Sequence, residues 1–248
     1  MRVLLVSTGL NDSIIKDCFW TKRKKRALDI FSAPSNNIDK TGVEGLDRVI
    51  KSNKITPDGI QDYTSIVLTN RLDVLLGVEG NQAQYDNIKD KYAKIISLAN
   101  QFYDMVIVDL DKNIGNIVEN EILRISDIVV AIISQREKQI MRTKEYIENS
   151  KILDGNKVIF TVGKYMEDTK YNAKNISRSL LKIRKRIINT IPYNNLYFEA
   201  SQEGKVVDLF LNFMRIKDTD PNYEFLEEIR RLDINIKEKI ELINLNKI

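Results

Sequence analysis

Short runs of apolar and β-branched residues recur along the chain, and between them apolar residues repeat every three or four positions. We expect strands at Arg2–Ser7, Ser65–Thr69, Asp73–Val78, Met105–Asp109, Ile128–Ser134 and Lys157–Val162. Most of these runs are apolar nearly throughout, which is typical of strands in a parallel sheet covered on both faces.

The segments between the strands have the spacing of amphipathic helices. Helices are predicted at Asn81–Phe102, Gln139–Ser150 and Asn175–Ile187. Strands and helices therefore alternate, which predicts an α/β fold: a doubly wound, mostly parallel sheet with helices on both faces and right-handed crossovers.

The clearest break in the pattern is Asp218–Asn222, which contains Pro221. Beyond it, apolar residues at helical spacing from Phe225 to Ile243 predict a long terminal helix. Its polar face mixes Glu and Lys, unlike a membrane-surface helix rich in Lys and Arg. We therefore expect an α/β domain over residues 1–217 and a C-terminal helix over residues 218–248, packed on the domain or on a partner.

Composition narrows the possible functions. The 248 residues are 43% hydrophobic and carry a net charge of +4, enough apolar material for a core but too small a basic excess to indicate nucleic-acid binding. The chain has no histidine and one cysteine, Cys18, which excludes an internal disulfide and every histidine-dependent catalytic pair. No signal peptide and no apolar stretch of roughly 20 residues is present, so we expect a cytoplasmic protein.

The first predicted strand leads into the segment Ser7–Ser13 (STGLNDS) and then into helical residues. A strand, a glycine turn and a helix N-terminus are the layout of a phosphate-binding loop, in which backbone N–H groups face the anion. Many βα turns share this layout, so its interpretation depends on the rest of the chain.

Four further segments carry a resemblance. Phe102–Asp109 (FYDMVIVD) resembles a "YDyvivD" strand, Ser126–Gln135 an "aD.vlvvls" strand, Leu72–Gly77 an "LdvlpG" strand, and Thr190–Val207 an "IPyd…eA…G.pv" segment. In this order they resemble the MinD/ParA family of deviant-Walker P-loop ATPases (SIMIBI class). The resemblance implies a P-loop NTPase-like fold of MinD/ParA type, nucleotide-gated dimerisation and an aspartate, here Asp109, close to the magnesium shell.

The loop departs from the KGGVGKT sequence of that family. Gly9 is kept, and Ser13 keeps the hydroxyl that would touch magnesium, but Ser7 stands at the signature lysine. Thr8 stands at the first glycine and Asn11 at the third. The resemblance therefore predicts an altered loop.

Asp12 stands where the family has its phosphate-contacting lysine. At an effective dielectric constant near 20, two like charges about 4 Å apart repel by roughly 4 kcal/mol. The remnant nucleotide site is Gly9, Asn11, Asp12, Ser13 and Asp109. Each of the last three also has a structural interpretation: Asp12 and Ser13 suit a helix N-terminus, and Asp109 suits a strand end.

Other parts of the family's nucleotide site are altered too. The "DtPpG" loop becomes Asp109–Asn113, without its proline and glycine, and Gly163 aligns with the adenine-contacting asparagine. Within Ala27–Asn37, where the switch aspartates belong, only Asp29 appears. These changes predict a pseudo-ATPase that is not an enzyme and holds no cofactor, with ATP and magnesium as the alternative.

The resemblance implies a positioning or assembly factor with a protein partner, a homodimer and a membrane-associated machine. Lys164–Arg178 resembles TadZ/CpaE-like proteins, which favours a pilus, secretion or conjugation apparatus. One alternative is an ATP-binding MinD/ParA-type ATPase with weak activity. Another is a ParA-like DNA segregation factor that uses Lys22–Arg26 and the helix carrying Arg178–Arg186, although both basic sets also suit solvated surfaces.

Overall fold

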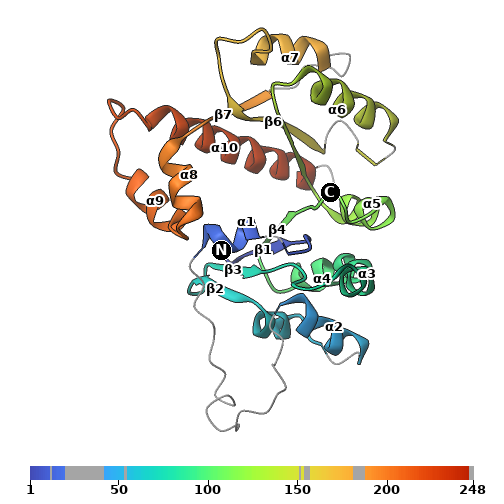
Figure 1. Ribbon diagram of the computed structural model, residues 1–248. Helices are drawn as coiled ribbons and strands as arrows, with labels where there is room; N and C mark the ends of the chain where they lie inside the picture. Colours follow the sequence, from blue (N-terminus) through green and yellow to red (C-terminus); the bar gives the residue numbers. More distant parts are fainter. Residues whose placement is uncertain are drawn as a thin grey trace. The chain divides into compact units, whose positions relative to one another are not determined.

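The structure is a computed structural model that describes residues 1–11, 13–19, 42–52, 55–150, 152–153, 157–180 and 188–245. The chain divides into two compact units (Figure 1). Unit 1 comprises Met1–Ile125 and Ala200–Val207, and unit 2 comprises Ser126–Glu199 and Asp208–Ile248. Each unit is built around its own sheet.

The sheet of unit 1 has the strand order β2-β3-β1-β4. Its strands are β1 (Val3–Ser7), β2 (Ser65–Leu68), β3 (Leu72–Leu75) and β4 (Met105–Asp109). β1 runs parallel to both β3 and β4, and only the edge strand β2 is antiparallel. The sheet is thus mostly parallel, as predicted, and β1 lies inside it between β3 and β4.

Helices pack on this sheet around one core. They are α1 (Ser13–Cys18), α2 (Val43–Lys51), η2 (Asp58–Tyr63), α3 (Gln82–Ile88), η3 (Lys89–Lys91), α4 (Tyr92–Ala99) and α5 (Asn116–Ile125). Leu4 and Val6 lie on the same face of β1, are fully buried and pack with buried side chains of α2 to α5, among them Leu46 and Tyr92. This core fixes the position of β1 and of the loop that follows it.

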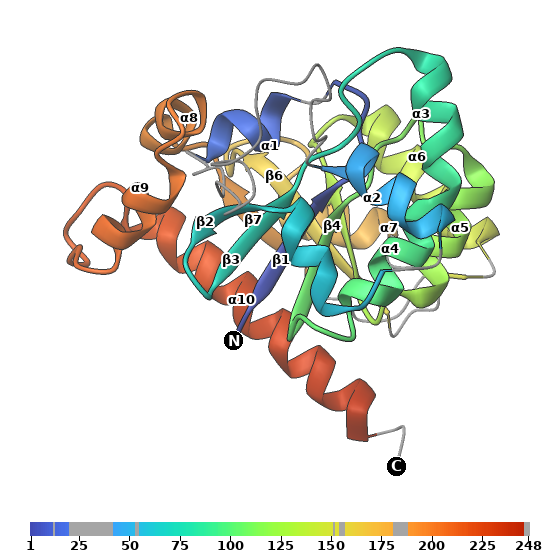
Figure 2. The ribbon, with the colours of Figure 1, turned by 90° about the horizontal axis from the view of Figure 1, so that it is seen from below.

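Unit 2 has a fully parallel sheet in the order β5-β6-β7. Its strands are β5 (Val129–Ile133), β6 (Val158–Tyr165) and β7 (Ile188–Pro192). The helices α6 (Glu137–Asn149) and α7 (Ala173–Leu180) lie on one side of this sheet and α10 (Tyr223–Leu245) lies on the other (Figures 1 and 2). The remaining helices are α8 (Asn195–Gln202) and α9 (Val206–Phe213).

The terminal helix α10 packs along β7. Phe225 and Leu226 are buried near its start. Further along, Glu228 accepts a hydrogen bond from Thr190 at 3.0 Å, and Asn235 donates one to the buried Asn189 at 2.5 Å. The helix is thus fixed by both apolar and polar contacts within unit 2.

The observed elements agree with the predicted α/β pattern, but α2, α5, α8 and α9 were not predicted, and other differences follow. All six predicted strands are present, and β7 is an additional strand. The helix predicted over residues 81–102 is divided into α3, η3 and α4. The helix predicted at Asn175–Ile187 is α7 as far as Leu180, and residues 181–187 lie outside the described part of the chain. None of the helices in that described part combines the length and the apolar character needed to cross a membrane.

Candidate functional site: the loop after β1

The candidate site lies at the carboxyl edge of the sheet of unit 1. β1 is parallel to β3 and β4, so the loops that follow these three strands leave the sheet at the same edge. Ser7 is paired in register with Asp109 at the end of β4. The structure therefore brings residues 8–11, 76–81 and 110–115 together, which is where an α/β fold places a ligand.

Thr8 connects the loop to the end of β4. Its backbone N–H donates to the carbonyl of Asp109 at 3.1 Å, and its hydroxyl donates to the same carbonyl at 3.0 Å. The same hydroxyl accepts the backbone N–H of Asp111 at 2.8 Å. Thr8 is fully buried, so its side chain points into the protein.

Tyr85 of α3 is a further hydrogen-bond partner of Thr8. Its hydroxyl donates to the carbonyl of Thr8 at 3.0 Å in a buried position. Burial, and then the charges of Asp111 and Asp86, raise the pKa of Tyr85 to about 12. Tyr85 therefore stays neutral and keeps its donor at physiological pH.

The segment after β3 contacts the other side of the loop. Asn11 donates its backbone N–H to the carbonyl of Val78 at 2.8 Å, and Val78 donates its own to the carbonyl of Gly9 at 3.1 Å. Leu10 and Val78 form an isolated parallel β-bridge. The N–H of Gly9 donates to the hydroxyl of Ser7 at 3.3 Å. Thr8, Gly9 and Asn11 thus all use their backbone donors within the protein.

Three of the five predicted site residues lie at this edge: Gly9 is buried, and Asn11 and Asp109 are exposed. Asp12 lies outside the described residues, and Ser13 is the first residue of α1, with a side chain that is not described. The basic run Lys22–Arg26 and the segment Ala27–Asn37 are outside the described chain as well.

Three acidic residues belong to the segments that meet the loop. Asp109 and Asp111 lie at the end of β4, and Glu79 follows β3. Lys16 of α1 forms a 2.6 Å ion pair with Glu79. Among the residues whose placement is described, no group of three or more histidine, cysteine or acidic side chains is arranged to hold a metal ion.

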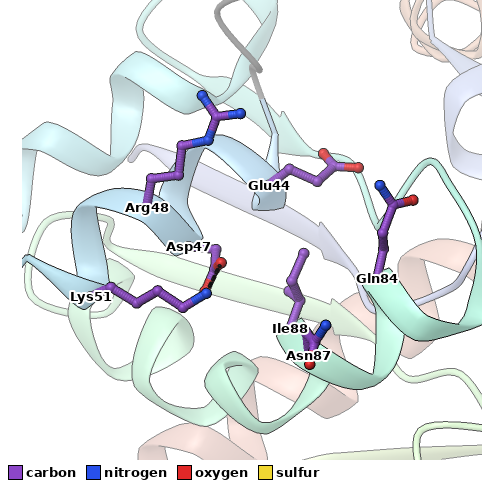
Figure 3. A pocket seen from close by; sticks show the side chains of 7 residues that line it. All are labelled: Glu44, Asp47, Arg48, Lys51, Gln84, Asn87 and Ile88. Atoms are coloured by element: carbon purple, nitrogen blue, oxygen red, sulfur yellow. Dashed lines mark hydrogen bonds and ion pairs between the residues drawn. The ribbon is translucent and has the colours of Figure 1, made fainter.

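A shallow hollow lies beside this site, between α2 and α3 (Figure 3). It is lined by Glu44, Asp47, Arg48, Lys51, Gln84, Asn87 and Ile88. Asp47 is largely buried and pairs with Lys51 at 2.8 Å and with Lys91 of η3. The sequence analysis did not predict this cluster, because its partners come from separate helices.

The chain is similar in structure to several solved proteins. A ParA family ATPase from Chlorobium tepidum TLS matches with a TM-score of 0.65 at 15% identity, covering 86% of this chain and 80% of that one. MinD complexed with Mg-ADP from Pyrococcus horikoshii OT3 matches with a TM-score of 0.56 at 11% identity, covering 96% and 86%. The MinC:MinD cell division protein complex from Aquifex aeolicus matches with a TM-score of 0.53 at 13% identity, covering 85% of this chain and 77% of that one.

The chain has the ParA/MinD fold. At these identities the likeness shows the fold alone, and neither a family model nor a curated protein sequence matches the chain. The fold agrees with the order of motifs from Leu72–Gly77 to Thr190–Val207.

Two of the loop positions that the resemblance predicts to be altered make structural contacts in this protein. Thr8 stands at a glycine of the KGGVGKT sequence, and its hydroxyl bridges Asp109 and Asp111. Asn11 stands at another glycine, and its side chain bonds to the backbone of Gly80. Glycine can make neither contact, because it has no side chain.

Proposed function

We propose that this protein is a non-catalytic ParA/MinD-like pseudo-ATPase that acts as a positioning or assembly factor. The observation that supports this proposal most directly is the internal bonding of the loop after β1. Thr8, Gly9 and Asn11 donate their backbone N–H groups to Asp109, Ser7 and Val78 respectively.

In a phosphate-binding loop such N–H groups point at the ligand. Here a nucleotide would first have to break the existing bonds, and each is worth roughly 0.5–1.5 kcal/mol net. The side chains of Thr8 and Asn11 add further bonds to the same arrangement. The loop is therefore organised for contact with its own protein rather than with a phosphate.

Electrostatics supports the same proposal. Asp109, Asp111 and Glu79 belong to the segments that meet the loop, and the nearby cation Lys16 is paired with Glu79. Losing a cation that clamps the transferred phosphoryl group costs phosphoryl-transfer enzymes orders of magnitude in rate. The sequence change at the phosphate-contacting lysine, Asp12, acts in the same direction.

A non-catalytic protein of this fold would act through protein partners. MinD has been solved in complex with MinC, which supports a partner protein for this chain as well. We propose that the chain forms a homodimer in the cytoplasm and helps to place a pilus, secretion or conjugation apparatus. Neither dimerisation nor partner binding would then depend on ATP.

The test is calorimetric titration of the purified protein with ATP and magnesium, next to an Asp12→Lys variant. We expect no heat of binding from the native protein up to millimolar ATP. If Asp12→Lys also fails to bind, restoring one lysine does not reopen the loop, as the internal bonds of Thr8 and Asn11 imply. Micromolar affinity of the native protein would contradict the proposal and restore the weakly active ATPase.

The DNA segregation alternative has a separate test. It requires the basic residues Lys22–Arg26 and Arg178–Arg186 to bind phosphates, so DNA affinity would fall steeply with salt. We expect no such binding. Salt-sensitive binding of duplex DNA that is lost when Lys22–Arg26 is neutralised would favour this alternative over the assembly factor.

A further inference from the structure

The loop after β1 and the segment 77–81 are far apart in sequence but closely joined. Leu10 and Val78 form a parallel β-bridge, with one hydrogen bond from Asn11 to Val78 and one from Val78 to Gly9. Gly9 and Val78 are both buried. The two segments thus extend the pairing of β1 and β3 beyond the ends of these strands.

Asn11 completes this pairing with its side chain. Its amide nitrogen donates to the carbonyl of Gly80 at 2.8 Å, and its amide oxygen accepts the N–H of Gly80 at 2.9 Å. Both backbone polar groups of Gly80 are thereby satisfied by one side chain. Asn11 has φ +52°, a left-handed conformation that asparagine adopts more readily than most residues.

The close approach of the two segments depends on Gly77. A Cβ atom on Gly77 would lie 2.2 Å from the carbonyl oxygen of Gly9, which is backbone and cannot rotate away. Any other residue at position 77 would therefore push the two segments apart.

A second set of contacts holds the segment 77–81 from its other side. The side chain of Glu79 forms an ion pair with Lys16. The backbone N–H of Glu79 donates a hydrogen bond to the carboxylate of Glu44 at 2.9 Å. Gln84 accepts the backbone N–H of Asn81 at 2.9 Å in a capping box that starts α3. Glu44 and Gln84 also line the hollow between α2 and α3 (Figure 3).

We propose that residues 77–81 are a built-in latch that keeps the loop after β1 closed, with Asn11 as the side chain that closes it. The latch takes the backbone donor of Asn11 and contacts Gly9 directly. This inference deepens the proposed function and rests on it for its biological meaning, since it names what keeps the loop from a phosphate. Whether residues 77–81 hold the loop closed is tested without nucleotide.

The test is amide hydrogen exchange, measured by NMR at single residues in the full-length protein. Asn11→Gly removes the closing side chain, and glycine accepts a positive φ without strain. The matched control is Asn70→Gly, because Asn70 is also exposed and has φ +60°, and its side chain makes no hydrogen bond to any residue that the structure describes.

In the native protein we expect the N–H groups of Asn11, Val78 and Gly80 to be protected. Asn11→Gly should speed exchange at Gly80 by about five- to tenfold, the effect of losing roughly 1–1.4 kcal/mol of hydrogen bonding. Asn70→Gly should leave these rates unchanged. Free exchange at Gly80 in the native protein, or no change in Asn11→Gly, would overturn the latch.

Titrating ATP into the same samples separates the two proposals. If Gly80 is unprotected and ATP does not bind, the latch is wrong and the pseudo-ATPase stands. If Gly80 is protected and native protein binds ATP at micromolar concentration, the pseudo-ATPase is wrong and the latch stands as the closed form of a nucleotide site. Protection without ATP binding supports both.

Discussion

Tyr85 and Tyr92 are both buried, but only the hydroxyl of Tyr85 has a hydrogen-bond partner among the described residues. Tyr85 donates to the carbonyl of Thr8 at 3.0 Å, whereas the buried hydroxyl of Tyr92 has no hydrogen-bond partner in the described part of the chain. We expect Tyr85→Phe to lower the free energy of unfolding by about 1 kcal/mol, because the carbonyl of Thr8 loses a buried donor. The matched variant Tyr92→Phe should leave stability unchanged or raise it. Chemical denaturation of both variants measures the difference, and equal effects would contradict this account.

The raised pKa of Tyr85 predicts that the stability of the protein depends on pH in the alkaline range. Burial, followed by the charges of Asp111 and Asp86, raises the pKa of Tyr85 from 10.0 to about 12 in the folded protein. A raised pKa contributes stability below the unfolded value, and that contribution is lost as the pH rises through the folded value. Part of the stability should therefore disappear between pH 10 and 12, and Tyr85→Phe should reduce this loss.

At the residue scale, the sequence predicted which positions of the loop are altered but not what the new side chains do. Thr8 bonds to residues about 100 positions away, at Asp109 and Asp111, and Asn11 bonds to Gly80. These contacts depend on the parallel register of β1 with β3 and β4, which apolar runs do not specify. The substitution pattern alone therefore predicts loss of a phosphate site, while the structure shows which contacts the side chains at these positions make.

At the scale of elements, α2 is tied to η3 by one carboxylate. Asp47 lies largely buried in α2, and it pairs with Lys51 of the same helix and with Lys91 of η3. Burial by itself would raise the pKa of Asp47, but the hydrogen bonds from Lys51 and Lys91 outweigh it and lower the pKa below 3.8. A lowered pKa contributes stability above the unfolded value, and this contribution is lost as the pH falls through the folded value.

We therefore expect Asp47→Asn to lower the free energy of unfolding at pH 7, because the ion pairs with Lys51 and Lys91 are lost. The expected loss is only about 1–2 kcal/mol, because Lys51 is exposed and solvent screens its interaction with Asp47. The difference from the native protein should shrink as the pH falls below 3.8. The control is Asp86→Asn, which removes a surface pair between the exposed Asp86 and the partly exposed Lys89 and should have little effect. Denaturation curves at several pH values test this, and a difference that persists in acid would contradict it.

Two of the differences between the predicted and the observed elements, at β7 and at η3, share a cause. β7 (Ile188–Pro192) contains Asn189, which is buried at 2% exposure, and a polar residue inside a short run weakens the pattern of a strand. Its burial is compensated by Asn235 of α10, 46 residues later. The predicted helix over residues 81–102 is interrupted at Lys89–Lys91, where Lys91 reaches Asp47. In both places a distant partner overrides the local pattern.

At the scale of the whole molecule, the predicted division into residues 1–217 and 218–248 remains to be tested. Within unit 2, α10 packs on β7 and contributes Phe225 to an aromatic cluster with Tyr197 and Phe213, whose ring centroids lie 5.7 and 6.2 Å from that of Phe225. Such pairs add to the apolar burial that holds a helix in place. The terminal helix is thus part of the core of unit 2 rather than an appendage to it.

Two truncations of the full chain follow from this packing. Ending the chain after Lys217 removes α10, exposes Phe213 and leaves the side-chain oxygen of Asn189 without the donor from Asn235, so we expect the amides of β6 and β7 to lose their protection from hydrogen exchange. Ending it after Ile240 is the control, because it removes Leu242 and Leu245, which are 60% and 68% exposed, and keeps the contacts that fix the helix. Protection in β1 and β4, which belong to unit 1, reports whether the shorter chain is folded at all. If β7 stays protected in the chain that ends at Lys217, α10 does not stabilise unit 2, and its apolar face would have to be assigned to a partner.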